Sequence, residues 1–398
     1  MSYAFNRSAL CISAAMLALT IAIPGLIDVA QAANGTIKLG VVAPMSGANS
    51  RYGAYAMHGA QLAINEINEA GGIGGKKLQI DSGDSQCAPV EGVSATQRLI
   101  NEDQVKYIIG DICSSVTLAM EPVVEDARVL LLNAASSNPD ITYKAGVGGF
   151  KWTYRNYPTD ETRAAMVVKY AAEQRNLHKF AVLAADSDYG RGAVAFSKKY
   201  LPENGSSIVS EDYFKEGEVD FHSVLSKIKA SGAQAILVYS PTDSSAIVGQ
   251  QMIEMGLAGK LPLVGAGDFS VPSNLAAAPA AMEGSIEATA WLPSYEGADN
   301  EAFVKRYEAA NGGEEPNTHA YQFWETTHLL AQAMINAKST EGDAVRAALS
   351  AIKYSSPMGT IVFDDHNQAR RPMILVEVKD GKPVIKGTVV GDIKYPAK

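Results

Sequence analysis

Gly110–Pro139 of this sequence reads GDICSSVTLAMEPVVEDARVLLLNAASSNP. The pattern predicts the end of one strand, a helix, a second strand and a loop. Each predicted strand is followed by small hydroxyl residues, in Cys113–Ser115 and in Ala135–Ser137. Because the carboxyl ends of parallel strands share one edge of a sheet, where such folds bind ligands, we expect both clusters to face one site.

These two clusters have the chemistry of a carboxylate site. Ser114 and Ser115 offer hydroxyls and backbone N–H groups at the start of the predicted helix, whose dipole favours an anion. Ala135, Ser136 and Ser137 add further hydroxyls and N–H groups after the second strand. The alternative is that the serines only cap helices and turns.

The N-terminal segment has the features of a secretory signal peptide. Arg7 precedes the apolar run Ala9–Ile27, and Ala30–Ala32 fits the small-x-small cleavage pattern, which predicts removal of residues 1–32. A retained membrane anchor is the alternative, but Pro24–Gly25 interrupts the run. We therefore expect the mature chain to be exported.

Length and composition limit the class of protein. Removing 32 of 398 residues leaves 366, more than one core usually supports, so we expect two domains. The net charge is −9 and no basic patch with interleaved aromatic residues appears, which argues against a nucleic-acid partner. After the signal peptide, no apolar run approaches the length of a transmembrane helix.

Two cysteines remain after the signal peptide, Cys87 and Cys113. In an oxidising compartment they indicate one disulfide, which would tie two predicted ligand-edge loops together. Two buried free thiols are the alternative.

No enzyme signature is present. The sequence lacks a phosphate-binding G-x-x-x-x-G-K-[ST] loop and a G-x-S-x-G nucleophile elbow. Its six histidines are scattered without the spacing of metal ligands. We therefore expect a binding protein with no catalytic residues, no cofactor and no metal.

Strands and helices alternate along most of the chain, which predicts an α/β fold with parallel sheets. The predicted strands are Thr36–Ala43, Lys77–Asp81, Lys106–Gly110, Lys179–Ala185, Ser207–Tyr213, Gln234–Ser240, Leu261–Gly265, Glu287–Ala290, Thr360–Asp364 and Met373–Lys379, with a turn at Asp380–Gly381. A strand, polar loop, Tyr-Gly and helix occur twice, in VVAPMSGANSRYG and AVLAADSDYG. This repeat suggests two similar lobes with Tyr52 and Tyr189 on opposite lips, unless each tyrosine packs locally on its own helix.

Acidic residues follow two strands of the second repeat. Asp268 comes after Leu261–Gly265, where a buried anion needs a cation such as a ligand ammonium. The alternative is that Asp268 caps a helix beginning near Val271. Asp243 follows Gln234–Ser240 and is a further candidate.

At the level of motifs, the chain resembles the periplasmic binding proteins of type I fold that serve branched-chain amino acid ABC transporters, the leucine/isoleucine/valine-binding class. The matching segments are GVVAPMSGANSRYG (Gly40–Gly53), GAQLAINEINEAGGIGGKKLQ (Gly59–Gln79), DSQC (Asp84–Cys87), YIIGDICSS (Tyr107–Ser115), NAASSNPD (Asn133–Asp140), DSDYGRG (Asp186–Gly192), AILVYS (Ala235–Ser240), VGAGDFS (Val264–Ser270) and IVFDDHNQ (Ile361–Gln368).

The resemblance implies two doubly wound, Rossmann-like α/β lobes joined by three crossovers and closing on a ligand. We place the first lobe at 33–158 plus 290–362 and the second at 159–289 plus 363–398. The resemblance also implies that Cys87 and Cys113 form a disulfide.

By motif position, the resemblance implies that Ser114, Ala135 and Ser137 hold the α-carboxylate of the ligand. It implies that Tyr52 and Tyr189 line the cleft from the two lobes. The acid that binds the ligand ammonium would be at or beside Asp268.

The function implied is that of a periplasmic, non-enzymatic component of an ABC importer. We expect a monomer that binds a small-molecule ligand, an amino acid with a branched-chain or other aliphatic side chain, and delivers it to an inner-membrane permease. The chain departs from the leucine-type pattern at Pro241–Asp243, where aromatic residues are usual, and at Gly267–Asp268. The alternatives are a receptor for aromatic carboxylic acids or amides, or a ligand sensor not coupled to transport.

Overall fold

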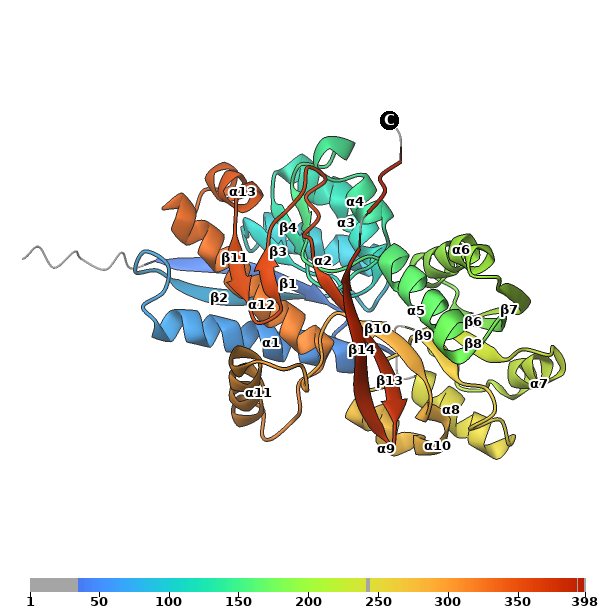
Figure 1. Ribbon diagram of the computed structural model, residues 1–398. Coiled ribbons are helices and arrows are strands. Elements are labelled where there is room, and N and C mark those ends of the chain that lie inside the picture. The colour runs from blue at the N-terminus through green and yellow to red at the C-terminus, as the bar shows by residue number, and fades with distance from the viewer. Residues whose placement is uncertain (1–34, 241–243, 392, 397–398) are drawn as a thin grey trace, which may run out of the picture.

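The computed structural model describes residues 35–240, 244–391 and 393–396. It contains two α/β lobes, each built on one sheet with helices packed on both faces (Figure 1). The predicted fold class is therefore confirmed. The predicted signal peptide, residues 1–32, and Asp243 lie outside the described residues.

Helices and strands alternate through both lobes. The first stretch comprises β1 (Thr36–Ala43), α1 (Ser50–Glu69), β2 (Lys77–Asp84), α2 (Pro89–Asn101), β3 (Tyr107–Ile109), α3 (Ser114–Ala127), β4 (Leu130–Asn133), α4 (Asp140–Tyr143), the 3-10 turn η1 (Gly146–Gly148) and β5 (Thr153–Arg155). The second comprises α5 (Asp160–Arg175), β6 (Lys179–Ala185), α6 (Asp188–Glu203), β7 (Ser207–Phe214), α7 (His222–Ala230), β8 (Ala235–Tyr239), α8 (Ser244–Glu254), β9 (Leu263–Ala266), α9 (Pro272–Ala277), α10 (Pro279–Met282) and β10 (Ile286–Thr289). The last comprises α11 (Ala298–Ala310), α12 (Thr318–Ala337), α13 (Gly342–Ser350), β11 (Tyr354–Ser356), β12 (Gly359–Ile361), β13 (Pro372–Lys379) and β14 (Lys382–Val390).

Both sheets share one strand order. The first sheet runs β2-β1-β3-β4-β5, with every pair parallel. In the second sheet, β7-β6-β8-β9-β10 repeats that order, and the antiparallel strands β13 and β14 extend it. The order reverses beside β1 and beside β6, and ligands bind at such switch points. The Tyr-Gly repeat in the sequence thus corresponds to two lobes of one topology.

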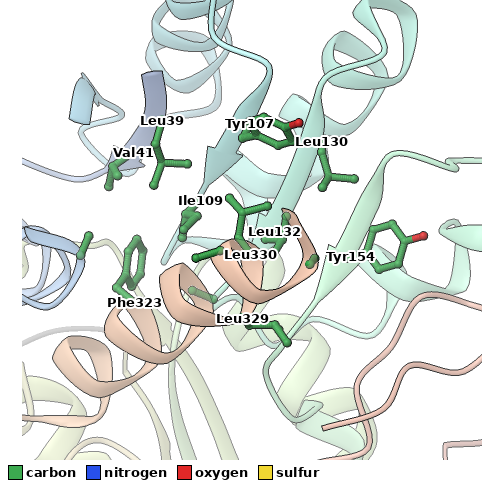
Figure 2. Close-up of a cluster of buried hydrophobic side chains, with 14 of the residues drawn as sticks. Leu39, Val41, Tyr107, Ile109, Leu130, Leu132, Tyr154, Phe323, Leu329 and Leu330 are labelled. Carbon is green, nitrogen blue, oxygen red and sulfur yellow. The ribbon is translucent and has the colours of Figure 1, made fainter. Parts of the chain in front are cut away.

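The core of the first lobe joins residues from both halves of the chain. Figure 2 shows Leu39, Ile109 and Leu132 of the sheet near Phe323 and Leu330 of α12. Each of these side chains is at most 1% exposed, and fully burying such a side chain contributes about 1.5–3 kcal/mol. Because α12 covers this sheet, the first lobe is complete only after the chain has returned from the second.

The centre of the second sheet is buried on both faces, which explains the uninterrupted apolar run AILVY of β8. Successive side chains of a strand point to opposite faces. Leu237 accordingly belongs to the same buried cluster as Val167 of α5, whereas Ile236 belongs to the cluster that contains Leu225 of α7 and Met252 of α8.

Three segments connect the lobes. They are residues 156–159, 290–297 and 362–371. The first and third lie side by side, because the N–H of Arg155 donates to the carbonyl of Asn367 (3.0 Å) and the N–H of Ala369 donates to the carbonyl of Arg155 (2.8 Å). On this basis we propose the lobe boundaries 33–158 plus 290–362 and 159–289 plus 363–398.

The C-terminal region agrees with the sequence prediction at one turn and differs from it at two strands. The predicted turn at Asp380–Gly381 is confirmed, with φ of 52° and 69° at its two residues. The chain then continues into β14, which was not predicted, because its mostly exposed residues KPVIKGTVV lack a regular apolar alternation. The strand predicted at Thr360–Asp364 is the shorter β12.

Candidate ligand-binding site

The carboxyl ends of both sheets face one cavity between the lobes. Loops after β2, β3 and β4 form one wall, and loops after β6, β7, β8 and β9 form the other. The lining residues are Cys87, Ile112, Cys113, Ser114, Ser115, Ala135, Ser137, Tyr157, Arg163, Ser187, Tyr189, Glu216, Ser240, Ala266, Gly267, Asp268 and His319. Residues of both hydroxyl clusters therefore line one cavity.

The first hydroxyl cluster opens helix α3. Ser114 is the first residue of the helix, and its hydroxyl accepts a hydrogen bond of 3.3 Å from the N–H of Asn138. Ser115 follows it in the first turn and also lines the cavity. The first N–H groups of a helix have no acceptor within the helix, and the dipole makes this end positive. The start of α3 is therefore suited to an anion.

The second cluster is shaped by Asn133, the last residue of β4. Its Oδ1 accepts from the N–H groups of Ala135 (2.9 Å) and Ser136 (2.8 Å), which folds the loop into a tight turn. Ser136 points away from the cavity, because its hydroxyl donates to the carbonyl of Asp111 (2.7 Å). Ser137 remains at the cavity wall. Of the predicted trio, Ala135 and Ser137 line the cavity, whereas Ser136 joins the loops after β3 and β4.

A disulfide between Cys87 and Cys113 joins the loop after β2 to the start of α3, with a Cα–Cα distance of 5.5 Å. The two cysteines are therefore paired, and the alternative of two free thiols is excluded. Both residues line the cavity. The disulfide thus fixes the position of the helix N-terminus that carries Ser114.

Tyr189 lies in the first turn of α6 and faces the cavity from the second lobe. Burial raises the pKa of its phenol well above the ordinary value, so the hydroxyl stays protonated and can donate a hydrogen bond. The N-cap residue Ser187 holds this turn by accepting from the N–H of Gly190 at 3.4 Å.

Asp268 lies in a pinned loop after β9. Its backbone is in the left-handed region, with φ of 52°, and its carbonyl accepts from the side-chain amide of Asn274 at 2.9 Å. The Glu287 carboxylate accepts from the N–H groups of Phe269 (2.8 Å) and Ser270 (3.1 Å). Burial, together with the nearby charge of Asp268, raises the pKa of Glu287 to about 7. These bonds hold the Asp268 side chain at the cavity wall.

Asp268 does not cap the following helix. The N-cap residue of α9 is Val271, which makes no side-chain capping bond. Across the cavity lies His319, whose pKa is lowered by burial, so its imidazole is neutral at pH 7. Asp268 therefore lines the cavity and does not act as a helix cap.

Arg163 was not identified by the sequence analysis, although it lines the cavity. It lies in the first turns of α5 and is 4% exposed. Its Nη1 donates to Asp160 Oδ1 at 2.6 Å and lies 3.4 Å from Ser137 Oγ in the first lobe. In the sequence, the only indication of its role was the (i, i+3) spacing from Asp160, and acid–base pairs at this spacing also occur on solvent-exposed helix surfaces.

Side-chain amides of the first lobe donate hydrogen bonds across the cleft to the second lobe. The side-chain amide of Asn49 donates to Glu216 Oε2 at 2.9 Å, and that of Asn138 donates to the carbonyl of Asp188 at 2.8 Å. Glu216 also lines the cavity, and burial raises its pKa. The structure is thus a closed arrangement of the two lobes.

Tyr52 supports the site from behind rather than lining this cavity. Its side chain is 4% exposed, and its ring packs on that of His319 with a centroid distance of 4.8 Å. His319 is the residue that reaches the cavity. Asp243, the remaining predicted ligand residue, lies outside the described residues.

Within the described part of the chain, no group of three or more His, Cys, Asp or Glu side chains could hold a metal ion. In the same ranges, no helix combines the length and the apolarity needed to cross a bilayer.

Residues 36–383 match the family model described as periplasmic binding protein. The chain belongs to this family. A curated member from Pseudomonas aeruginosa, named leucine-, isoleucine-, valine-, threonine- and alanine-binding protein, is 28% identical over 348 residues, which are 86% of this chain and 90% of that protein.

Solved structures of this family share the fold. The branched-chain amino acid transporter substrate-binding protein of Streptococcus pneumoniae, in complex with isoleucine, is 25% identical with a TM-score of 0.79, covering 89% of this chain and 99% of that one. An ABC transporter solute-binding protein of R. palustris, in complex with benzoate, is 22% identical with a TM-score of 0.81, covering 89% and 96%. The chain is therefore a periplasmic solute-binding protein of type I fold, of the leucine/isoleucine/valine-binding class.

Proposed function

We propose that this protein captures a free amino acid between its lobes and delivers it to an inner-membrane ABC permease. The observation that carries the proposal is the pairing of opposite chemistries across one cavity. Ser114 and Ser137 line the wall of the first lobe, and Asp268 lines the wall of the second. Such a cavity is complementary to a zwitterion.

The carboxylate of the amino acid is assigned to the first lobe. Hydroxyls of Ser114 and Ser137 donate to it, together with N–H groups at the start of α3. Hydrogen bonds to a charged group contribute about 1.5–3 kcal/mol each, more than neutral ones. The helix dipole adds to the attraction.

The ammonium of the amino acid is assigned to Asp268. The left-handed turn and the bonds to Glu287 hold its loop in place before ligand arrives. A carboxylate in a closed cavity is costly without a cation, and the ligand ammonium supplies one.

For the side chain of the ligand we propose an aliphatic, branched-chain group. Ile112, Ala135 and the Cys87–Cys113 disulfide give the first-lobe wall an apolar section beside the serines. The names of the curated relative and of the isoleucine complex support the same class.

Closure of the lobes accounts for capture and release. The bonds from Asn49 to Glu216 and from Asn138 to Asp188 form only when the lobes meet. A ligand that contacts both walls binds the closed state more tightly than the open state and therefore favours closure. Binding to a permease can shift the equilibrium back to the open state and release the ligand.

An aromatic carboxylic acid is a second candidate. Tyr157 and Tyr189 place two phenol rings at the cavity, and a solved member of the fold holds benzoate. Such a ligand would use the same serines but would leave Asp268 without a cation, which is why we favour an amino acid.

A thermal-unfolding screen of ligand-free protein tests this proposal. The panel contains the common amino acids, benzoate, 4-hydroxybenzoate and the corresponding amides. A ligand at one hundred times its dissociation constant should stabilise the protein by about 2.7 kcal/mol. We expect stabilisation by at least one amino acid; stabilisation by aromatic acids alone would favour the second candidate.

A further inference from the structure

Arg163 is a buried cation at the boundary between the lobes. It belongs to α5 of the second lobe, yet its Nη1 lies 3.4 Å from Ser137 Oγ of the first. The backbone brings the same elements together, because the N–H of Asp160 donates to the carbonyl of Ser137 at 3.0 Å. The guanidinium therefore sits next to a hydroxyl that we assign to the ligand carboxylate.

The guanidinium is held rigidly in the wall of the cavity. Nη1 donates to Asp160 Oδ1 (2.6 Å), Nε donates to the carbonyl of Ala288 (3.1 Å), and Nη2 lies 3.5 Å from the Tyr157 hydroxyl. A guanidinium has five N–H groups in a fixed plane and no acceptor. These contacts leave donor capacity at Nη2, whose neighbour Tyr157 also lines the cavity.

The charge of Arg163 is retained in this buried position. Burial alone would lower its pKa, but Tyr189, Asp160 and Tyr157 together raise it above the ordinary value. The Asp160 carboxylate is itself buried and has a second oxygen, Oδ2, without a hydrogen-bond partner among the described residues. The pair thus brings a fixed, protonated donor to the cavity.

We propose that Arg163 completes the carboxylate site from the second lobe and determines that the ligand is a carboxylate rather than an amide. The carboxylate of the ligand binds alongside Ser137 and Arg163 with hydrogen bonds to both. This inference rests on the proposed function and narrows its ligand class. It also makes the carboxylate a link between the lobes, so that closure depends on it.

An amide cannot replace the carboxylate at such a site. Its NH₂ group would face the N–H groups of Arg163, which can only donate, and one donor would stay buried and unpaired. A carboxylate instead forms charge-assisted bonds. We expect the carboxylate to bind about 10- to 100-fold more tightly than the matched amide.

Calorimetric titration with two matched pairs, L-leucine with L-leucinamide and benzoate with benzamide, tests the proposal. In the unaltered protein, each carboxylate that binds should exceed its amide by the stated factor. Arg163→Gln should reduce the difference, and Arg163→Lys, which keeps the charge, should restore much of it. Arg175→Gln is the matched control, because Arg175 ends the same helix outside the cavity and pairs with Glu377.

Because Arg163→Gln leaves Asp160 as a buried unpaired acid, the double variant Asp160→Asn/Arg163→Gln provides a second test if the single variant does not fold. Equal affinity for L-leucine and L-leucinamide, or an undiminished preference in a folded Arg163→Gln or double variant, would overturn the role of Arg163 and leave the proposed function intact. Failure of every carboxylate in the wider screen would instead contradict the proposed function.

Discussion

Asn49 of the first lobe and Glu216 of the second are joined by a hydrogen bond of 2.9 Å across the mouth of the cleft. Asn49 is 3% exposed, and Glu216 also lines the ligand cavity. No chain segment links these two residues directly, so the bond exists only while the lobes are closed. Closure of the cleft therefore brings Asn49 into contact with a residue of the ligand-cavity wall.

We expect Asn49→Ala to weaken ligand binding by favouring the open state. A hydrogen bond to a charged group contributes about 1.5–3 kcal/mol, and its loss leaves Glu216 buried without this donor. Affinity by calorimetry and the radius of gyration by small-angle scattering measure the effect. Glu203→Gln, at an exposed position of the second lobe, which also carries Glu216, is the control. An unchanged affinity and radius in Asn49→Ala would show that the bond does not govern closure.

Ser114→Ala and Ser137→Ala should each weaken carboxylate ligands by about 1–3 kcal/mol, because each removes a donor to a charged group. Titration calorimetry with L-leucine and with benzoate measures the loss. Unchanged affinity in both variants would remove these serines from the site.

Ser136→Ala is the informative contrast to these two variants. The Ser136 hydroxyl donates to Asp111 and pairs with Thr117 at 2.7 Å, away from the cavity. We expect a lower free energy of unfolding, by about 0.5–1.5 kcal/mol, with a smaller change in affinity than Ser137→Ala produces. A larger loss of affinity than in Ser137→Ala would place Ser136 in the ligand site.

Asp268→Asn should weaken ligands that carry an ammonium group and spare simple carboxylic acids. Neutralising the acid removes the partner of the ammonium while the shape of the side chain is kept. L-leucine and its deaminated counterpart, 4-methylpentanoate, form a matched pair for calorimetry. Equal losses for both ligands would contradict the ammonium role.

Glu121 on α3 should make stability depend on pH. Both of its carboxylate oxygens are buried without a hydrogen-bond partner among the described residues, and burial raises its pKa to about 9. Because the pKa is raised in the folded state, its contribution to stability is fully present below the pKa of the unfolded chain. It is lost progressively as the pH rises toward 9.

Glu121→Gln tests this dependence, because it keeps the shape of the neutral acid. Chemical unfolding of the variant and of the unaltered protein at pH 5, 7 and 9 should show a smaller loss of stability in the variant. Glu173→Gln, at an exposed position on α5, is the control. Parallel pH profiles for Glu121→Gln and the unaltered protein would show that Glu121 is not the titrating group.

Strand topology made the position of the site predictable. Ser114 and Ser137 follow neighbouring parallel strands, β3 and β4, so sequence pattern alone placed them at one edge. The disulfide between Cys87 and Cys113 was predicted on other grounds, from the presence of two cysteines in an exported chain and from the family resemblance.

Side-chain direction and long-range packing were not predictable from local pattern. Ser136 differs from Ser137 only in which way its side chain points, and this is decided by the turn around Asn133. Tyr52 is buried because α12 later brings His319 against it. Arg163 occupies a helix position that suits a solvated charge equally well, and only the docking of the lobes makes it a cavity residue.

The central claim is that one cavity binds the carboxylate of an amino acid at Ser114 and Ser137 and its ammonium at Asp268. Calorimetric titration of the ligand-free protein with each common amino acid tests this claim most directly. We predict saturable binding at one site per chain for at least one amino acid, with an aliphatic one binding most tightly. The absence of saturable binding by every amino acid, in protein that unfolds cooperatively, would contradict the claim.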